Sequence, residues 1–222
     1  MTNSLLLIWE SLPLFLKGTF VTVQLFFSAS FISLILGTCL GILLSDKCKV
    51  PYLSKFTAGW AFIAKAVPFF VQLLIVYFVL PDLFGFSLSP LIASIIALGA
   101  CSSGYVAQFI QGAINAIPHS QWEAAFTLGY SKKRTVLAII FPQSLRIALP
   151  SLNNELESLL KSTAVASSIG MLELTRIGMN VVSREMEPVP IYLAIAFFYL
   201  CLSLLLNFAN KLIEKKVSYV KY

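Results

Sequence analysis

The sequence contains few charged residues. Its 222 residues include 16 lysines and arginines and 10 aspartates and glutamates, so only 12% are charged, whereas 58% are apolar. A soluble globular domain carries about 25% charged residues. This scarcity excludes most ordinary soluble enzymes.

Cysteine and histidine are also scarce. The four cysteines, Cys39, Cys48, Cys101 and Cys201, stand alone without CxxC spacing and indicate neither disulfides nor zinc. The single histidine, His119, has no Cys, Asp or second His at metal-ligand spacing, so we expect it at the surface. The sequence predicts no metal site.

A phosphate-binding GxxxxGK[ST] loop is absent from the sequence. The nearest match, Lys161 to Thr163, has Leu160 where glycine is required and no glycine-rich loop before it. No nucleophile and base pair for other chemistry is recognisable. We therefore predict that this chain is not an enzyme and does not itself hydrolyse ATP.

The uncharged runs are long enough to cross a bilayer. Mean hydropathy is +0.86, and a spanning helix needs about 20 apolar residues. The sequence predicts an all-α membrane protein: a single domain, residues 1–222, with five transmembrane helices or, as the alternative, six. The expected spans are 20–44, 58–80, 91–114, 147–170 and 188–210, with a loop at 117–146. Residues 1–10 lack the basic region of a cleavable signal, so we expect the first span to be retained.

The basic residues predict the orientation of the chain. Cytoplasmic loops are enriched in Lys and Arg, which also accounts for the net charge of +6 without nucleic-acid binding. With the N-terminus outside, only Lys17, Arg176 and Arg184 lie outside, and Lys65 and Lys161 lie within the membrane. The inner segments then hold Lys47, Lys49, Lys55, Lys132, Lys133, Arg134, Arg146, Lys211, Lys215, Lys216 and Lys221. We predict an external N-terminus and a cytoplasmic C-terminus and 117–146 loop.

Two glycines in the first span have GxxxG spacing. Gly37 and Gly41 would allow a neighbouring helix to approach closely. The alternative is that they are unrelated glycines in a membrane helix.

The predicted cytoplasmic loop has a helix signature. Ser120 and Glu123 have the spacing of a capping box just after Pro118, Gly129 suits a left-handed helix end, and a second short helix is expected from Ser131.

The same segment resembles the EAA loop of ABC importer permeases. The pattern is Glu123, Ala124, Ala125, Gly129, Ile139 and Phe141-Pro142, with Phe141 replacing the usual leucine. QWEAAFTLGY, FPQSLRIALPSL, NNELESLLKST, SSIGMLELT and the upstream PFFVQL are similar to the polar amino-acid permease family, in register over residues 20–215.

The resemblance implies a type I ABC importer permease in the bacterial cytoplasmic membrane. Its implied partners are two cytoplasmic ATP-binding subunits, a second permease copy or homologue, and an extracytoplasmic solute-binding protein that delivers an amino acid. Glu123, Ala124, Ala125 and Gly129 would form the ATPase-coupling helix, whose rigid-body movement reaches the spans. The alternative is that they only cap and pack an ordinary loop helix.

Three ionisable residues interrupt the fourth predicted span. Glu155, Glu157 and Lys161 would be costly in lipid and indicate a cavity or an ion pair. The family resemblance implies that Glu155 takes a substrate ammonium group and Lys161 a carboxylate. Residues 155 and 161 do not share one helix face, whereas Glu157 and Lys161 do, so an internal Glu157–Lys161 pair is the alternative.

Glutamines complete the predicted substrate path. Gln108 and Gln111 stand where the family has charged residues, and Gln72 lies in the PFFVQL run. Each is a candidate either for substrate contact or for hydrogen bonding between helices.

Two other classes of function remain as alternatives. An ion-coupled secondary transporter would use Glu155, Glu157 and Lys161 as a relay, but it predicts inverted repeats that the sequence does not display. A membrane scaffold without transport leaves the interior charges unexplained.

Overall fold

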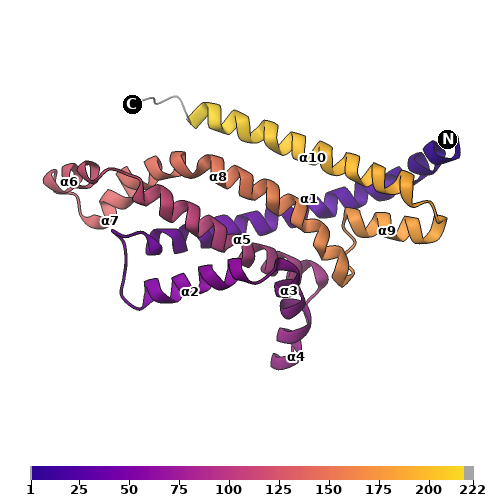
Figure 1. The fold of residues 1–222 in the computed structure, drawn as a ribbon, viewed down its shortest axis with the longest axis horizontal. Coiled ribbons are helices and arrows are strands. Elements are labelled where there is room, and N and C mark those ends of the chain that lie inside the picture. The colour runs from indigo at the N-terminus through magenta and orange to yellow at the C-terminus, as the bar shows by residue number, and fades with distance from the viewer. Residues whose placement is uncertain (1, 218–222) are drawn as a thin grey trace. The chain divides into compact units, whose positions relative to one another are not determined.

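The computed structural model describes residues 2–217, and within them all regular secondary structure is helical (Figure 1). The α-helices are α1 Thr2–Leu44, α2 Leu53–Ala66, α3 Phe69–Leu74, α4 Leu80–Phe84, α5 Pro90–Asn115, α6 His119–Thr127, α7 Lys132–Thr135, α8 Phe141–Ser162, α9 Leu174–Glu185 and α10 Pro188–Val217. Two π-helical turns, η1 Ile75–Val79 and η2 Val136–Ile140, and a 3₁₀ segment, η3 Thr163–Ile169, adjoin them. Lys221 lies outside the described residues.

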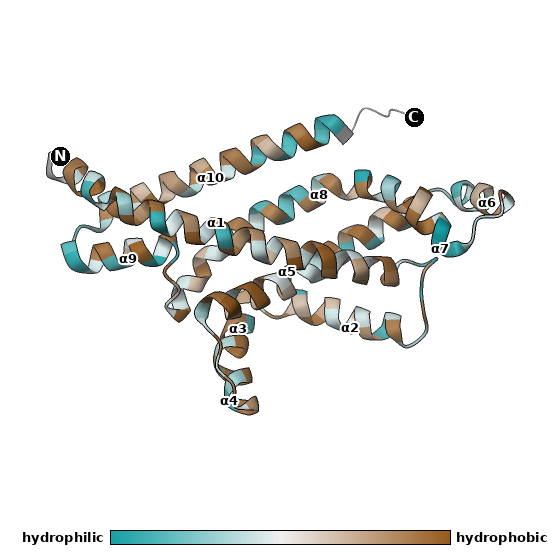
Figure 2. Cartoon of the chain, turned by 180° about the vertical axis from the view of Figure 1, so that it is seen from behind, coloured by the Kyte–Doolittle hydropathy of each residue, from teal (hydrophilic) through white to brown (hydrophobic). Residues whose placement is uncertain are grey.

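Long apolar helices dominate the described part of the chain. Four are long and apolar enough to cross a membrane: Ser4–Leu44, Pro90–Asn115, Lys132–Ile169 and Pro188–Lys216. A fifth is obtained if Leu53–Ala66 and Phe69–Phe84 form one broken span. Figure 2 shows hydrophobic residues along most of α5 and α10 and hydrophilic residues on α7. The predicted all-α class is confirmed, with four or five candidate spans among residues 2–217 and no candidate for a sixth.

Two helices extend beyond the charge-free runs from which the spans were predicted. Helix α1 begins at Thr2 rather than near residue 20, so Lys17 lies inside it. Residues 132–146 were expected in the cytoplasmic loop, but they belong to the continuous helical stretch Lys132–Ile169. A charged residue marks where apolar sequence ends, but it does not terminate a helix.

The second predicted span, 58–80, is broken at Pro68. Val67 precedes Pro68 and has φ −89° and ψ 129°, outside the helical region. The ring of a proline disfavours helical backbone in the residue before it. Helix α2 therefore ends at Ala66, and α3 starts at Phe69.

The helices contribute to two compact units. Unit 1 comprises 1–31, 68–99 and 156–209, and unit 2 comprises 32–67, 100–155 and 210–222. Each has its own buried apolar clusters. In unit 1, one cluster includes Leu25, Leu98 and Leu159, and another includes Phe15, Leu174 and Ile191. In unit 2, the largest is built around Val106, Ile110, Trp122 and Ile140.

Helices α1 and α5 approach closely in unit 2. A Cβ added to Gly37 would lie 2.5 Å from Val106 Cβ and 2.8 Å from the Ser103 carbonyl oxygen. A Cβ added to Gly41 would lie 2.7 Å from the Ala107 carbonyl oxygen. The predicted role of the GxxxG pair in close helix approach is confirmed.

A buried carboxylate begins α9 in unit 1. Glu173 accepts hydrogen bonds from the backbone N–H of Thr175 at 2.8 Å and of Arg176 at 2.7 Å, and from the Tyr199 hydroxyl at 3.0 Å. Burial raises the pKa of the Glu173 carboxyl above its ordinary value, and these hydrogen bonds oppose the rise. One side chain thus caps α9 and joins it to α10.

Replacing Glu173 with alanine is expected to destabilise the protein by about 2–3 kcal/mol, because a helix cap and a buried hydroxyl acceptor are lost together. In a chain of this size the melting temperature should fall by roughly 4–12 °C, measured by thermal unfolding in detergent. Glu185→Ala, at the exposed end of the same helix, should change stability by no more than about 0.5 kcal/mol. Equal effects of the two variants would contradict the capping role.

The raised pKa of Glu173 gives this prediction a pH signature. An acid whose pKa is higher in the folded than in the unfolded state contributes stability at low pH and loses it as the pH rises through the folded-state value. Wild-type stability should therefore decline relative to Glu173→Gln as the pH rises through the folded pKa, and a difference independent of pH would argue against burial as the cause.

Candidate functional site

Helix α6 begins differently from the predicted capping box. Its N-cap is Pro118, which supplies no side-chain hydrogen bond, and Ser120 is the second helical residue. The capping-box prediction is therefore wrong, because the helix starts one residue before Ser120 rather than after it. Glu123 instead lies with its Oε1 2.9 Å from Nδ1 of His119, and both side chains are exposed. The predicted surface position of His119 is confirmed.

The end of α6 follows the sequence prediction. Gly129 has φ 79°, in the left-handed region, and the N–H of Tyr130 bonds to the Ala125 carbonyl at 3.0 Å. Ser131 then caps α7 by accepting a hydrogen bond from the N–H of Arg134 at 3.4 Å. Left-handed glycine satisfies the last carbonyls of a helix, so α6 is a short helix with defined ends.

Helix α6 has one buried face and one free face. Trp122 and Ala125 are each 1% exposed and belong to the interior of unit 2. Glu123 and Ala124 are exposed, as are two large apolar side chains, Phe126 at 48% and Leu128 at 75%. Of the two alanines predicted to form the coupling surface, only Ala124 is accessible, and Ala125 packs inward.

Two contacts join α6 and α5 to the loop after α1. The Lys47 ammonium lies over the Trp122 ring, 5.7 Å from its centroid, where a cation is attracted to the π face. Asn115 accepts from the backbone N–H of Asp46 at 3.0 Å and donates to the Asp46 carboxylate at 2.9 Å. These contacts could not be predicted from the sequence, because the partners lie far apart in the chain.

The charged residues of α8 form separate interactions. In unit 1, the Lys161 ammonium donates to Glu157 at 2.7 Å, the i,i+4 pair that the sequence left as an alternative. In unit 2, Glu155 accepts a hydrogen bond from Ser102 at 2.7 Å, and Ser102 accepts one from Ser33 at 2.8 Å. Sequence reasoning missed both serines, since neither differs from an ordinary small residue of a membrane helix.

The predicted glutamines have different surroundings. In unit 2, Gln108 accepts a hydrogen bond from Lys65 at 2.6 Å, and Gln111 donates to the Leu44 carbonyl at 3.1 Å. Both line a cavity of about 380 Å³ with Gly112, Asn115 and Ser151 among the other lining residues. Gln111 thus makes the interhelical bond that was its alternative role. Gln72 lies half-buried on α3 in unit 1.

The chain matches known transport proteins along most of its length. Residues 37–219 match the family described as binding-protein-dependent transport system inner membrane component. The L-cystine transport system permease protein TcyB of Bacillus subtilis is 29% identical over 208 residues, covering 92% of this chain and 87% of that protein. A putative glutamine transport system permease protein GlnP of Rickettsia felis is 35% identical over 206 residues, covering 90% and 91%.

A solved structure agrees with these sequence matches. The crystal structure of an amino acid ABC transporter with histidines has a chain that superposes with a TM-score of 0.84 at 29% identity, covering 94% of this chain and 96% of that one. The predicted resemblance is confirmed: the chain belongs to the family of binding-protein-dependent transport system inner membrane components. It is the multi-pass permease subunit of an ABC importer in the inner membrane, not its ATPase, and such a system includes an ATPase and a binding protein.

Proposed function

We propose that the chain is the permease of an importer for a polar amino acid, driven by ATP that two cytoplasmic partner subunits bind and hydrolyse. The substrate class is supported by the relatives named for cystine and glutamine transport and by the amino acid transporter structure. A second copy or a homologue completes the membrane part, and an extracytoplasmic binding protein delivers the substrate.

In this proposal the exposed face of α6 contacts the ATPase subunits and couples their movement to the membrane helices. An exposed carboxylate, a small alanine and two exposed apolar side chains lie on or at the end of a short helix anchored from behind by Trp122 and Ala125. Together they offer a mixed apolar and charged surface to a protein partner, which supports a coupling role. We assign Glu123 and Ala124 to ATPase contact and Ala125 and Gly129 to fixing the helix that makes it.

The orientation follows from the distribution of positive charge. Helix α7 carries Lys132, Lys133 and Arg134, and basic residues are retained on the cytoplasmic side. In the proposed topology the N-terminus is outside, the α6–α7 loop is cytoplasmic, and the C-terminus is cytoplasmic.

Unit 2 contains one set of candidate substrate contacts in this proposal. Glu155 is the acidic group for a substrate ammonium, and Ser33 and Ser102 orient it through the hydrogen bonds described above. Gln108 and Lys65 offer a neutral and a positive group on the same unit. In unit 1, Lys161 with Glu157 remains the candidate for a substrate carboxylate, and Gln72 remains a candidate for lining the path.

Uptake in proteoliposomes tests the proposed function. The permease is reconstituted with its ATPase subunits and binding protein, and radiolabelled glutamine, cystine and arginine are supplied outside with ATP inside. Uptake that requires ATP and competes with unlabelled amino acid is expected. Uptake that follows a proton or sodium gradient without ATP would instead support a secondary transporter that uses Glu155, Glu157 and Lys161.

Glu155→Gln is expected to raise the amino-acid concentration for half-maximal uptake by at least about tenfold, because a hydrogen bond to a charged group contributes about 1.5–3 kcal/mol. The readout is initial uptake rate against amino-acid concentration. Gln111→Ala is the control, since its amide is bonded to a backbone carbonyl; it should lower thermal stability without shifting that concentration. If the concentration for half-maximal uptake is unchanged in Glu155→Gln, Glu155 does not contact the substrate.

A further inference from the structure

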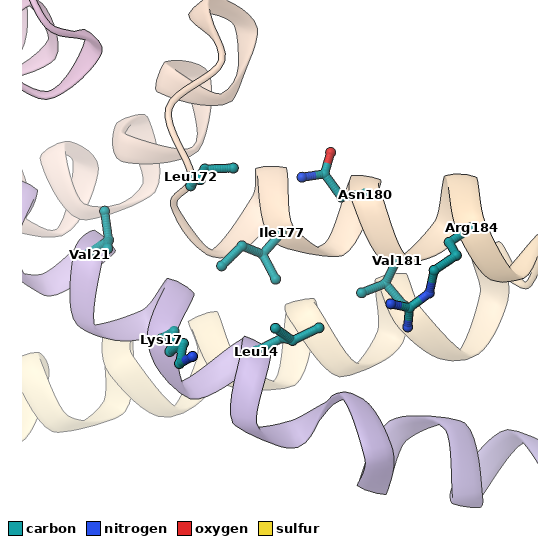
Figure 3. Close-up of a pocket in the computed structure, with 8 residues that line it drawn as sticks. All are labelled: Leu14, Lys17, Val21, Leu172, Ile177, Asn180, Val181 and Arg184. Atoms are coloured by element: carbon teal, nitrogen blue, oxygen red, sulfur yellow. The ribbon is translucent and has the colours of Figure 1, made fainter.

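Unit 1 contains a second cavity, between the first half of α1 and α9 (Figure 3). Its volume is about 530 Å³, within the range of ligand pockets. It is lined by Leu14, Lys17, Val21, Leu172, Ile177, Asn180, Val181 and Arg184. Figure 3 shows Ile177, Val181 and the guanidinium of Arg184 on the side of α9 that faces Leu14 and Lys17 of α1.

The lining combines apolar walls with positive charge. Five of the eight lining residues are aliphatic, two are cations, and none is acidic. Lys17 has no ion-pair partner within residues 2–217, and Arg184 uses only Nε in its bond to Glu185. The two terminal amino groups of Arg184 and the Lys17 ammonium are therefore available to an anion.

The walls of this cavity are fixed to each other. The backbone of α9 approaches so near that a Cβ on Gly18 would lie 2.8 Å from Leu174 Cα. The N–H of Leu174 donates to the Thr22 hydroxyl at 3.1 Å, and Glu173 caps α9 at the same point. The cavity is thus part of the packed framework of unit 1.

Both cations border membrane-spanning sequence. From Gly18 to Ser45 the chain has no charged residue. At 1.5 Å per residue this stretch of helix is about 42 Å long, which is more than the roughly 30 Å thickness of the hydrocarbon core of a bilayer. Arg184 lies four residues before Pro188, where the uncharged run of α10 begins. Lys and Arg at such borders reach into the phospholipid headgroup layer.

We propose that this cavity binds one anionic phospholipid, whose phosphate lies between Lys17 and Arg184 and whose acyl chain follows Val21, Leu172 and Ile177. Guanidinium groups bind phosphate through paired hydrogen bonds, and a lysine ammonium binds it as a point charge. An acidic protein partner would match the charge but not the aliphatic walls, so the lipid fits both features.

Native mass spectrometry of the purified permease–ATPase complex tests the proposal. Delipidated complex is titrated with dioleoyl phosphatidylglycerol or dioleoyl phosphatidylcholine. The wild type is expected to bind one phosphatidylglycerol per permease chain at least about tenfold more tightly than phosphatidylcholine. The double variant Lys17→Gln, Arg184→Gln should lose this preference, whereas Lys17→Arg, Arg184→Lys should retain it.

A matched variant separates the site from general charge effects. Lys211→Gln with Lys215→Gln removes the same number of exposed cations from the other end of α10 and should leave the preference intact. Equal binding of the two lipids by wild type, or loss of preference in the Lys211 and Lys215 variant alone, would overturn the proposal. The proposal would also be overturned if the Lys17→Gln, Arg184→Gln variant binds lipid normally but loses affinity for the binding protein in phosphatidylcholine nanodiscs. That result would mean that the surface serves protein docking.

Discussion

Gly37→Ala is expected to destabilise the permease by about 1–3 kcal/mol or more, as overpacking of a tightly fitted interior does. The new methyl group would meet Val106 Cβ at 2.5 Å and the Ser103 carbonyl oxygen at 2.8 Å. The second of these is backbone and cannot rotate away, so α1 and α5 must separate. For a chain of this length the melting temperature should fall by roughly 2–12 °C, and Gly41→Ala should behave similarly.

The chain offers two glycines as internal controls. Gly59 on α2 and Gly112 on α5 have no atom within 4 Å of an added Cβ. Alanine there should leave stability unchanged or raise it by about 0.5–1 kcal/mol, because glycine is the poorer helix former. A Gly37→Ala protein as stable as Gly59→Ala would mean that α1 and α5 are not in close contact in the membrane.

Glu123→Ala is expected to reduce ATP-driven amino-acid uptake at least about tenfold while the complex still inserts and still hydrolyses ATP. The reason is the position of Glu123 on the free face of α6, where it can anchor the helix to a partner without supporting the interior of unit 2. Loss of one charge-assisted hydrogen bond, about 1.5–3 kcal/mol, accounts for that magnitude. Uptake and ATPase activity are measured on the same proteoliposomes.

His119→Ala distinguishes contact with a partner from contact within the helix. His119 is the only side chain shown to pair with the Glu123 carboxylate among residues 2–217, and an exposed pair contributes about 0–1 kcal/mol to stability. If Glu123 acts on the ATPase, His119→Ala should transport nearly normally. Equal loss of uptake in Glu123→Ala and His119→Ala would mean that Glu123 acts only through its contact with His119 within the helix.

The features that the sequence predicted well are local in the chain. The i,i+4 spacing of Glu157 and Lys161 offered their ion pair as an alternative, and Gly129 predicted a left-handed helix end. Each depends on backbone geometry within a few residues, so a pattern of residue types is sufficient to reveal it.

The features that the sequence did not reveal join distant segments. The Ser102 hydrogen bond to Glu155 and the Lys65 bond to Gln108 bring together residues 53 and 43 positions apart. Helix packing determines such pairs, and small polar residues in membrane helices carry no mark of their partners. The inward position of Ala125 was also not predicted. Helix α6 has only nine residues, which are too few for the spacing of apolar residues to indicate which face is buried.

The π-helical turn η2, between α7 and α8, bears on how the chain tolerates a change in length. A π turn contains one residue more than the α turn it replaces, as if a single residue had been inserted at Val136–Ile140. Because the π turn accommodates the extra residue locally, deleting one residue there would restore a regular α-helix and leave the directions of α7 and α8 nearly unchanged. A homologue one residue shorter at this point would therefore present the connected helix α6 at nearly the same angle, and a single-residue gap here would leave the docking geometry of the permease unchanged.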